Sequence, residues 1–131
     1  MRKAKLVSEI SRYLDELEEV LPDEDQFFKD KLCQYGLSML ILNIINGCID
    51  LGTEVINTKQ LGYPEKYKDI FNILETKKII SPALAKRMRN LVSLRNLLAH
   101  EYGEIDLGLL YESAKELRFV EEYVNTLIKH L

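Results

Sequence analysis

The residues with the clearest chemical potential lie in one short segment, residues 95–102, with the sequence Arg-Asn-Leu-Leu-Ala-His-Glu-Tyr. An arginine can bind phosphoryl oxygens through its planar guanidinium, and an imidazole can transfer a proton near neutral pH. Arg95 and His100 are therefore candidate catalytic residues for phosphoryl chemistry. Asn96 could orient His100 or hydrogen-bond a phosphate, and Tyr102 adds a hydroxyl two residues after the histidine.

These four side chains can lie near one another only if the segment is helical over most of its length. At about 100° per residue, Asn96 and His100 share one face of a helix, and Arg95 lies beside the apolar stripe with its guanidinium pointing outward. Tyr102 returns towards the side of Arg95 if the helix continues that far. We therefore expect one polar cleft at the C-terminal end of a helix.

Each of these residues also has an ordinary structural explanation. Arg95 could pair with a carboxylate, His100 could interact with the helix dipole, and Tyr102 could simply pack against the core. An Arg-x4-His pair alone would arise by chance in about one chain in ten of this composition. With Asn and Tyr also at their positions, the chance falls to a few in about ten thousand, so the complete segment is specific.

The charge around this segment is distributed unevenly. Between Thr76 and His100 there are six basic residues and no acidic one, although the whole chain has a net charge of −3. Lys86, Arg87 and Arg89 lie in this run and are candidate RNA-binding residues, because neutralising phosphates is what such side chains contribute to nucleic-acid affinity. The alternative is an ordinary solvated helix face.

Hydrophobic spacing predicts the helices that must hold these residues. Apolar side chains recur every three or four positions in five stretches, residues 6–21, 28–51, 67–74, 84–98 and 110–131. The helices are expected to be separated by helix ends, caps and one loop. The first helix should end near Pro22, and residues 52–64 should form a loop. Ser81-Pro82 should be an N-cap and first turn, Gly103 a helix stop and Asp106 an N-cap. The predicted fold is all-α, an antiparallel bundle of four to five helices.

The second stretch carries two apolar stripes instead of one. One stripe passes through Phe28, Leu32, Tyr35, Met39, Leu42 and Ile49, and the other through Leu37, Ile41, Ile44, Cys48 and Leu51. A helix that is apolar on two sides must be covered on two sides. We expect this helix to be the central member of the bundle and to be covered partly by a second subunit.

Composition limits the remaining possibilities. With 131 residues and 47% hydrophobic residues, the chain is expected to form a single domain, residues 1–131. Cys33 and Cys48 fall on one predicted helix, roughly 22 Å apart, so they cannot pair, which favours a reducing, cytoplasmic compartment. With only two histidines and no Cys-x-x-Cys, neither a metal site nor a cofactor is expected. The polar interruptions between Leu37 and Leu51 argue against a membrane span.

The sequence from about Gly36 to Asp106 resembles the HEPN domain family, most closely its HepT-like toxins. The resemblance is carried by GYPEKYKDIFNILETKKIIS, by ISPALAKRMRNLVSL, by the segment RNLLAHEY, and by the following GEID. It implies a helical bundle that dimerises through its helices, so that two Arg-x4-His motifs face a shared cleft. The implied activity is a metal-independent endoribonuclease toxin acting on cellular RNA, with tRNA among the candidate substrates.

The resemblance also gives Tyr102 a specific role. In HepT-like toxin–antitoxin systems a minimal nucleotidyltransferase, the antitoxin, transfers AMP to the tyrosine of the His-x-Tyr element, so Tyr102 is the expected site of AMPylation. Two alternatives stay open at this point. The chain could be a non-catalytic HEPN module that binds a nucleotidyltransferase, or a structural helical bundle in which the motif is fortuitous.

Overall fold

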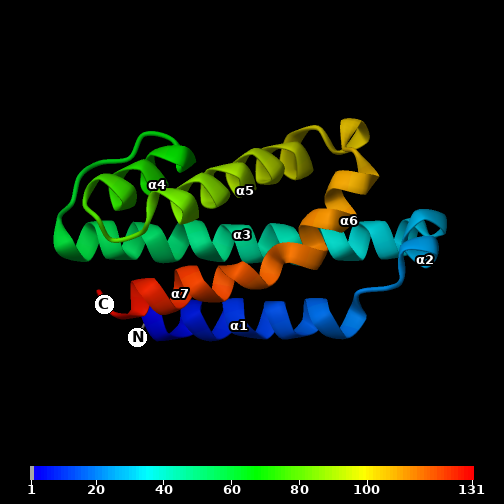
Figure 1. The fold of residues 1–131 in the computed structure, drawn as a ribbon, viewed down its shortest axis with the longest axis horizontal. Coiled ribbons are helices and arrows are strands. Elements are labelled where there is room, and N and C mark those ends of the chain that lie inside the picture. Colours follow the sequence, from blue (N-terminus) through cyan, green and yellow to red (C-terminus); the bar gives the residue numbers. More distant parts are fainter. Residues whose placement is uncertain (1) are drawn as a thin grey trace.

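The computed structural model describes residues 2–131, and these form helices joined by short turns, with no strand among them. The α-helices are α1 (Arg2–Val20), α2 (Glu24–Lys29), α3 (Lys31–Lys59), α4 (Tyr67–Thr76), α5 (Pro82–His100), α6 (Leu107–Glu116) and α7 (Val120–Ile128), and the short 3-10 helices are η1 (Tyr102–Glu104) and η2 (Leu117–Phe119). Figure 1 shows α3 along the middle, with α4 and α5 on one side and α1 and α7 on the other. The prediction of an all-α bundle is confirmed.

The long helix α3 is the central element and contacts every other α-helix. Its predicted stripe through Leu37, Ile41, Ile44, Cys48 and Leu51 is buried throughout. The helix also continues to Lys59, so the loop predicted to begin at Gly52 is wrong. Val55 and Ile56 extend the buried stripe, and Gly52 leaves room for α4 and α7, because a Cβ there would lie 2.7 Å from both Ile70 Cγ2 and the Tyr123 hydroxyl.

The start of α3 differs from the prediction because Asp30 separates it from a short helix, α2. Phe28 belongs to the separate helix α2, which ends at Asp30 in an extended conformation. The Asp30 carboxylate then accepts hydrogen bonds from the backbone N–H groups of Leu32 and Cys33 and caps α3. The hydrogen bond from the Cys33 N–H lowers the pKa of Asp30. Cys33 and Cys48 are both free thiols, as their spacing predicted.

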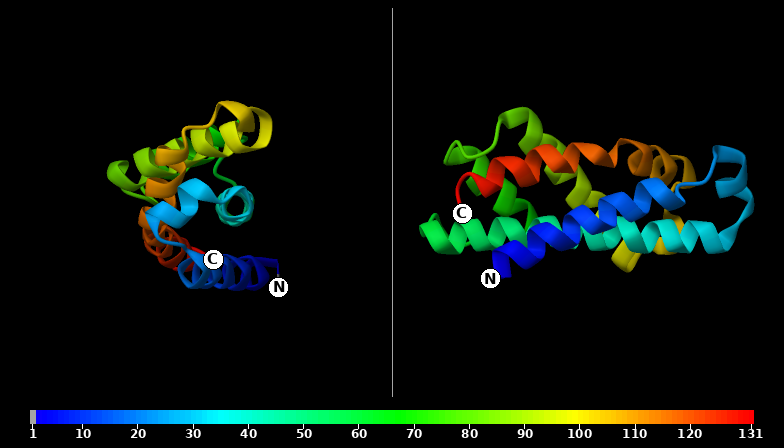
Figure 2. Two further views of the ribbon diagram at one scale, coloured as in Figure 1. Left: turned by 90° about the vertical axis from the view of Figure 1, so that its right-hand side faces the viewer. Right: turned by 90° about the horizontal axis from the view of Figure 1, so that it is seen from below.

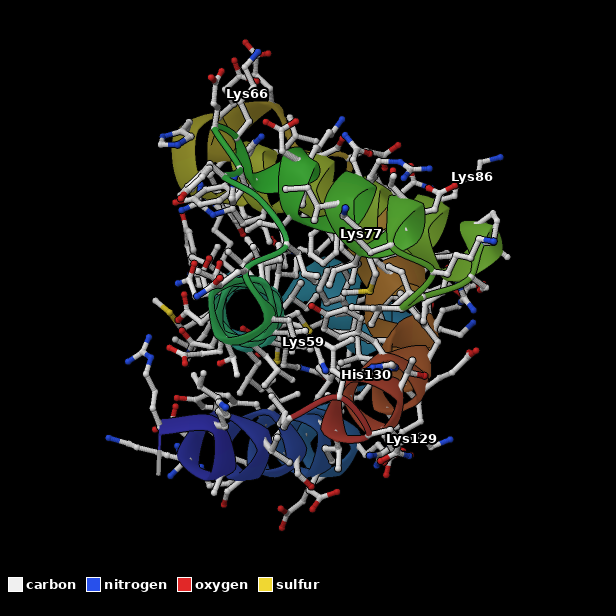
Figure 3. All side chains as sticks on the ribbon, turned by 90° about the vertical axis from the view of Figure 1, so that its left-hand side faces the viewer. Lys59, Lys66, Lys77, Lys86, Lys129 and His130 are labelled. Atoms are coloured by element: carbon white, nitrogen blue, oxygen red, sulfur yellow. The ribbon has the colours of Figure 1, made fainter. Side chains whose placement is uncertain are left out.

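The second predicted stripe is exposed up to Met39, whereas Leu42 is partly buried and Ile49 is buried. Leu32 is 80% exposed, and the neighbouring side chains Phe28, Tyr35 and Met39 are each about half exposed. The end-on views, in the left panel of Figure 2 and in Figure 3, show α3 at the edge of the bundle, with the other helices to one side of it. We call the side chains of Phe28, Leu32, Tyr35 and Met39 the open α3 face.

The helix α5 begins as predicted and ends earlier than predicted. The Ser81 hydroxyl accepts the backbone N–H of Leu84, and Pro82 occupies the first helical position. The helix ends at His100, and Glu101 breaks its dihedral pattern, so Gly103 is not its stop. Tyr102 therefore lies in η1, outside the helix.

The last predicted helix is two helices. Asp106 caps α6 as expected, with its carboxylate accepting the N–H groups of Gly108 and Leu109. The turn η2 then interrupts the helix, and α7 takes a new direction that lies along α1 (Figure 1). Arg118, in η2, bridges to Glu18 of α1 and to Glu121 of α7, which fixes the change of direction.

By length and composition, α3 is the one described helix that could cross a membrane. Half of its most apolar window is buried inside the bundle. The other helices therefore cover much of the surface that lipid would have to contact, as in the core helix of a bundle.

Candidate active site

Arg95 lies on the inner side of α5, where that helix crosses α3 and the start of α4. Its Nε donates a hydrogen bond to Asn46 Oδ1 of α3 at 3.1 Å, and its Nη1 donates to Asn96 Oδ1 at 3.3 Å. The guanidinium carbon Cζ lies 4.6 Å from the ring centroid of Tyr67, a cation–π contact. Three neighbours from three helices therefore fix one guanidinium.

The Arg95 guanidinium has no acidic partner, because no carboxylate within residues 2–131 lies within 4 Å of it. Amide oxygens and an aromatic ring orient the group without neutralising its charge. The side chain is only partly buried, so N–H groups remain available for an anion. The alternative in which Arg95 serves a structural ion pair is not the arrangement observed.

Sequence analysis did not identify Asn46 and Tyr67 as parts of this site. Asn46 counted only as a polar interruption in an apolar helix, and Tyr67 as a member of the apolar stripe of α4. The sequence offered one indication for Asn46: it is a polar residue within the apolar stretch of a helix that was expected to be central in the bundle. The position of α4 over α5, which brings Tyr67 to Arg95, depends on tertiary packing.

Asn96 lies on the outer side of Arg95 and lines a hollow between α5 and the start of α4. The hollow has a volume of about 470 Å³, and its other lining residues are Glu65, Lys66, Tyr67, Lys68 and Val92. Asn96 accepts the hydrogen bond from Arg95 through its carbonyl oxygen, so its amide N–H groups are directed elsewhere. The hollow therefore continues the surface around the guanidinium.

His100 is the last residue of α5 and is exposed. Its ring makes no side-chain hydrogen bond to any residue between 2 and 131. Five helical positions separate it from Arg95, which places the two side chains about 140° apart around the helix axis. The guanidinium faces α3 and α4, whereas the imidazole faces away from them.

Tyr102 packs against the open α3 face. Its ring stacks on that of Tyr35, with centroids 5.0 Å apart and an interplanar angle of 23°. Its hydroxyl oxygen lies 3.4 Å from the hydroxyl oxygen of Ser38. Tyr102 is partly buried, so its position combines the packing role with an accessible edge.

The structure therefore brings together Arg95 and Asn96 but does not place all four predicted residues in one cleft of one chain. His100 lies on the opposite side of α5, and Tyr102 lies beyond the end of the helix. The spacing of five helical residues turns the imidazole away from Arg95, and the early end of α5 takes Tyr102 out of the helix.

The three predicted RNA-binding residues point in different directions. Arg89 forms an ion pair with Glu75 of α4, with Nη1 2.7 Å from Oε1. The Arg87 guanidinium lies 3.8 Å from the ring centroid of Phe119, in the groove between α5 and α6. Lys86 and Arg87 are both exposed and have no ion-pair partner among the described residues. Because Arg87 is held against Phe119, a phosphate contact on this strip stays a prediction for Lys86.

Within the described part of the chain, no three His, Cys, Asp or Glu side chains gather in a group suited to a metal ion. The groups beside Arg95 are the amides of Asn46 and Asn96 and the phenol of Tyr67, and the imidazole of His100 lies on another side of α5. Such groups bind anions and transfer protons.

Comparison with known proteins identifies the family. Residues 10–127 match the family described as ribonuclease HepT-like. The mRNA nuclease HepT of Shewanella oneidensis is 25% identical over 122 residues, which cover 92% of each chain. The tRNA nuclease HepT of Aphanizomenon flos-aquae is 32% identical over 101 residues, 74% of this chain and 67% of that protein.

Solved structures share the fold over nearly the full length. A crystal structure of a toxin–antitoxin complex with AMP-PNP contains a chain that matches with a TM-score of 0.91 at 23% identity, over 97% of both chains. The tri-AMPylated HEPN toxin of Shewanella oneidensis, in complex with an MNT antitoxin, also gives 0.91 at 23% identity, over 97% of this chain and 96% of that one. The structure of the cytosolic protein YutE of Bacillus subtilis, of unknown function, matches with a TM-score of 0.74 at 21% identity, over 95% of this chain and 89% of that one.

The match to the family covers almost the whole chain and includes the segment that holds Arg95, His100 and Tyr102. The two HepT relatives and the HEPN folds of the solved structures agree with it. This chain belongs to the ribonuclease HepT-like family.

Proposed function

We propose that this chain is the toxin of a toxin–antitoxin system, a metal-independent endoribonuclease that cleaves cellular RNA with Arg95 and His100. The observation that carries the proposal is the state of Arg95, whose guanidinium is held by Asn46, Asn96 and Tyr67 and has no carboxylate partner within residues 2–131. A charge fixed in advance and left without an internal counter-ion is suited to stabilising negative charge on a phosphate.

The chemistry follows from these groups. The ribose 2′-OH attacks the adjacent phosphorus, a P–O2′ bond forms, and the P–O5′ bond breaks to leave a cyclic phosphate and a 5′-hydroxyl. One imidazole takes the proton of the 2′-OH, and a second gives a proton to the leaving O5′. The Arg95 guanidinium binds the non-bridging oxygens as negative charge accumulates on them, and Asn96 positions the guanidinium or the phosphate.

This scheme requires two chains, because one chain has a single histidine near the site. The other histidine, His130, lies at the C-terminal end of the chain. The open α3 face supports a homodimer, since its four large apolar side chains form an exposed patch that a second chain could bury, and Tyr102 lies beside them. We propose that dimerisation through this face places the His100 of one chain opposite the Arg95 of the other.

Tyr102 is the proposed point of control by a nucleotidyltransferase antitoxin. One solved relative is an AMPylated HEPN toxin in complex with its MNT antitoxin. The phenol of Tyr102 lies two residues from His100 and against Tyr35 of the open α3 face. An AMP group attached there would add bulk and negative charge beside the imidazole, which would repel an RNA phosphate.

The decisive experiment is induced expression of the wild-type chain beside His100→Ala and Arg95→Ala, at matched soluble levels. We expect growth arrest and new RNA fragments on a denaturing gel for the wild type alone. Circular dichroism of the purified variants controls for folding. RNA cleavage that survives in both folded variants would refute the proposed role of the motif.

The main alternative, a non-catalytic partner of a nucleotidyltransferase, gives a different result in the same experiment. In that case all three chains would permit equal growth and leave RNA intact. Binding to a co-expressed nucleotidyltransferase would then depend on Tyr102 and the open α3 face, and Tyr102→Phe would lose AMPylation without any change in RNA.

A further inference from the structure

An aromatic and basic surface lies where the loop after α3 meets α4, and sequence analysis assigned it no function. We call it the tyrosine–lysine corner and define it as Tyr63, Lys66, Tyr67 and Lys68. Tyr63 is 97% exposed, more than any other large hydrophobic side chain described, and Tyr67 is 42% exposed. Both lysines are exposed and have no ion-pair partner among residues 2–131.

The backbone of this corner is fixed by hydrogen bonds. The Asp69 carboxylate accepts the N–H groups of Glu65 and Lys66 at 3.1 and 3.0 Å, and the N–H of Leu61 bonds to the carbonyl of Ile56 at 2.9 Å. Gly62 turns the chain between these two anchors with a φ of 148°, which few other residues adopt. The exposed ring of Tyr63 is thus presented by an ordered turn.

The corner is continuous with Arg95. The Tyr67 ring that belongs to the corner is the one beneath the Arg95 guanidinium, at 4.6 Å. The hollow of about 470 Å³ beside Asn96 is lined by Lys66, Tyr67 and Lys68. A ligand that occupies the hollow therefore touches the corner and the two side chains, Tyr67 and Asn96, that contact the Arg95 guanidinium.

The basic strip of α5 is less suited to a ligand than the corner. Arg89 is engaged by Glu75 and Asn72 of α4, and Arg87 stacks on Phe119. The lysines of the corner have no such partners among the described residues, and unlike Lys86, which is also unpaired there, they line the hollow beside Asn96. Figure 3 shows Lys66 and Lys86 in different parts of the α4–α5 layer, and of these two lysines only Lys66 lines the hollow beside Asn96.

We infer that the tyrosine–lysine corner is a docking surface for single-stranded RNA, and this inference rests on the proposed ribonuclease function. Tyr63 stacks on an unpaired base, Lys66 and Lys68 bind flanking phosphates, and the strand passes over Tyr67 to bring its scissile phosphate to Arg95. Exposed aromatic rings with interleaved cations are the common means of binding single strands, because a base can stack on a protein ring only when it has left its own stack.

The charge of the corner sets the expected strength of the electrostatic contribution. Glu65 is also exposed at this corner and offsets one of the two lysines. Stacking must therefore carry a large share of the affinity, with a modest dependence on salt. Each lysine that contacts a phosphate should add about 0.7 to the slope of log affinity against log salt.

The test uses the full-length chain with His100→Ala, which keeps the RNA intact, and an unstructured fluorescent oligoribonucleotide. We expect Tyr63→Ala to weaken binding by roughly 5- to 150-fold and Tyr63→Trp to restore it. Lys66→Ala and Lys68→Ala should each lower the salt slope by about 0.7. Lys129→Ala, an exposed lysine at the other end of the molecule in Figure 3, is the matched control and should leave both quantities unchanged.

The active chain gives a second readout. With His100 intact, Tyr63→Ala should raise KM for a single-stranded substrate and leave kcat nearly unchanged, because Tyr63 contacts a base that is remote from the scissile phosphate. Unchanged RNA affinity and KM in Tyr63→Ala would overturn the inference, as would equal losses for a fully paired duplex of the same sequence. So would a loss of dimerisation or antitoxin binding in place of RNA binding, which would assign the corner to a protein partner.

The inference and the proposed function fail separately. If the chain binds single-stranded RNA through Tyr63 but cleaves none, the docking surface stands and the ribonuclease proposal falls. If it cleaves RNA with His100 and Arg95 while every corner variant behaves as wild type, the ribonuclease proposal stands and the docking surface falls.

Discussion

Asn46 and Arg95, 49 residues apart in the sequence, are joined by a hydrogen bond of 3.1 Å from Nε to Oδ1 that links α3 to α5. A guanidinium can bind a phosphate end-on through its two Nη groups, and Nε takes no part in that arrangement. With Nε used by Asn46 and one N–H of Nη1 used by Asn96, Nη2 and the second N–H of Nη1 stay available for a phosphate. The amide of α3 is therefore placed to set the direction of the guanidinium without reducing its charge.

We expect Asn46→Ala to lower kcat for RNA cleavage by about 10- to 100-fold, because a guanidinium displaced by about 1 Å loses much of its effect on the transition state. Single-turnover kinetics on an oligoribonucleotide would measure it. Asn43→Ala, on the same helix and without a bond to Arg95, is the matched control. Equal rates for the Asn46 and Asn43 variants would show that Arg95 needs no support from α3.

Arg95→Lys should fail although it keeps the charge. A lysine cannot form the bond to Asn46 and the bond to Asn96 while also offering a fork to a phosphate. We expect kcat to fall by about 100-fold or more, with a nearly normal thermal unfolding curve because the side chain is only partly buried. A lysine variant as active as the wild type would contradict the phosphate-clamp role.

The open α3 face should control oligomeric state. Leu32→Glu introduces a charge at a side chain that is 80% exposed, so the fold of one chain has little reason to change. We expect it to convert a dimer to a monomer in light scattering and to abolish RNA cleavage. Val20→Glu, at an exposed apolar residue at the end of α1, provides the control. A dimeric Leu32→Glu chain would place the interface elsewhere.

Tyr123→Phe should destabilise the bundle without affecting the site. The Tyr123 hydroxyl, fully buried, donates a hydrogen bond to the carbonyl of Cys48 at 2.8 Å, and burial raises the pKa of this phenol. Removal of one buried hydrogen bond costs about 1 kcal/mol, and the Cys48 carbonyl keeps its helical partner. The free energy of unfolding in urea would measure the loss, and Tyr63→Phe at an exposed tyrosine should cost nothing measurable.

The Arg118 bridge predicts a dependence of stability on pH. The Arg118 guanidinium, hydrogen-bonded to the Glu18 carboxylate at 2.7 Å, lowers the pKa of Glu18. A lowered folded-state pKa means that the contact stabilises the fold above the unfolded pKa and that this contribution is lost as pH falls through the folded pKa. Arg118→Gln should therefore lower Tm at neutral pH, and the difference from wild type should shrink below about pH 5.

The control for this pH series is Lys115→Gln, which removes a cation whose ion pair with Glu112 lies within a single helix. It should change Tm little at any pH, as is usual for exposed pairs within one helix. A constant Tm difference for Arg118→Gln between pH 7 and pH 3 would contradict the role of the carboxylates.

Local patterns in the sequence determine much of the fold. The caps at Ser81 and Asp106 and the buried stripe of α3 could be predicted because each depends on neighbours within a few residues. The end of α3 could not, because Gly52 looks like a helix stop until α4 and α7 are seen to press against it. Close approach of three helices outweighs the low helix propensity of glycine there.

The sequence predicts which residues are candidates for the site but not how they lie relative to one another. Arg95 and Asn96 lie together as expected, whereas the five-residue helical spacing turns His100 about 140° away from Arg95, and Tyr102 lies outside the helix because α5 ends at His100. The fate of each basic side chain also depended on distant partners. Nothing near Arg89 in the sequence indicates that Glu75 neutralises it, since that pair exists only where α4 lies on α5.

The opposed directions of Arg95 and His100 on one helix have a consequence for dosage. If two chains must meet to assemble each proton donor with each phosphate clamp, then below the dissociation constant the cleavage rate rises with the square of the chain concentration. A twofold fall in expression would then lower the rate about fourfold. The helical spacing of Arg95 and His100 would then make toxicity depend steeply on the concentration of free chain. A trace of free chain would be harmless, and a modest surplus would not.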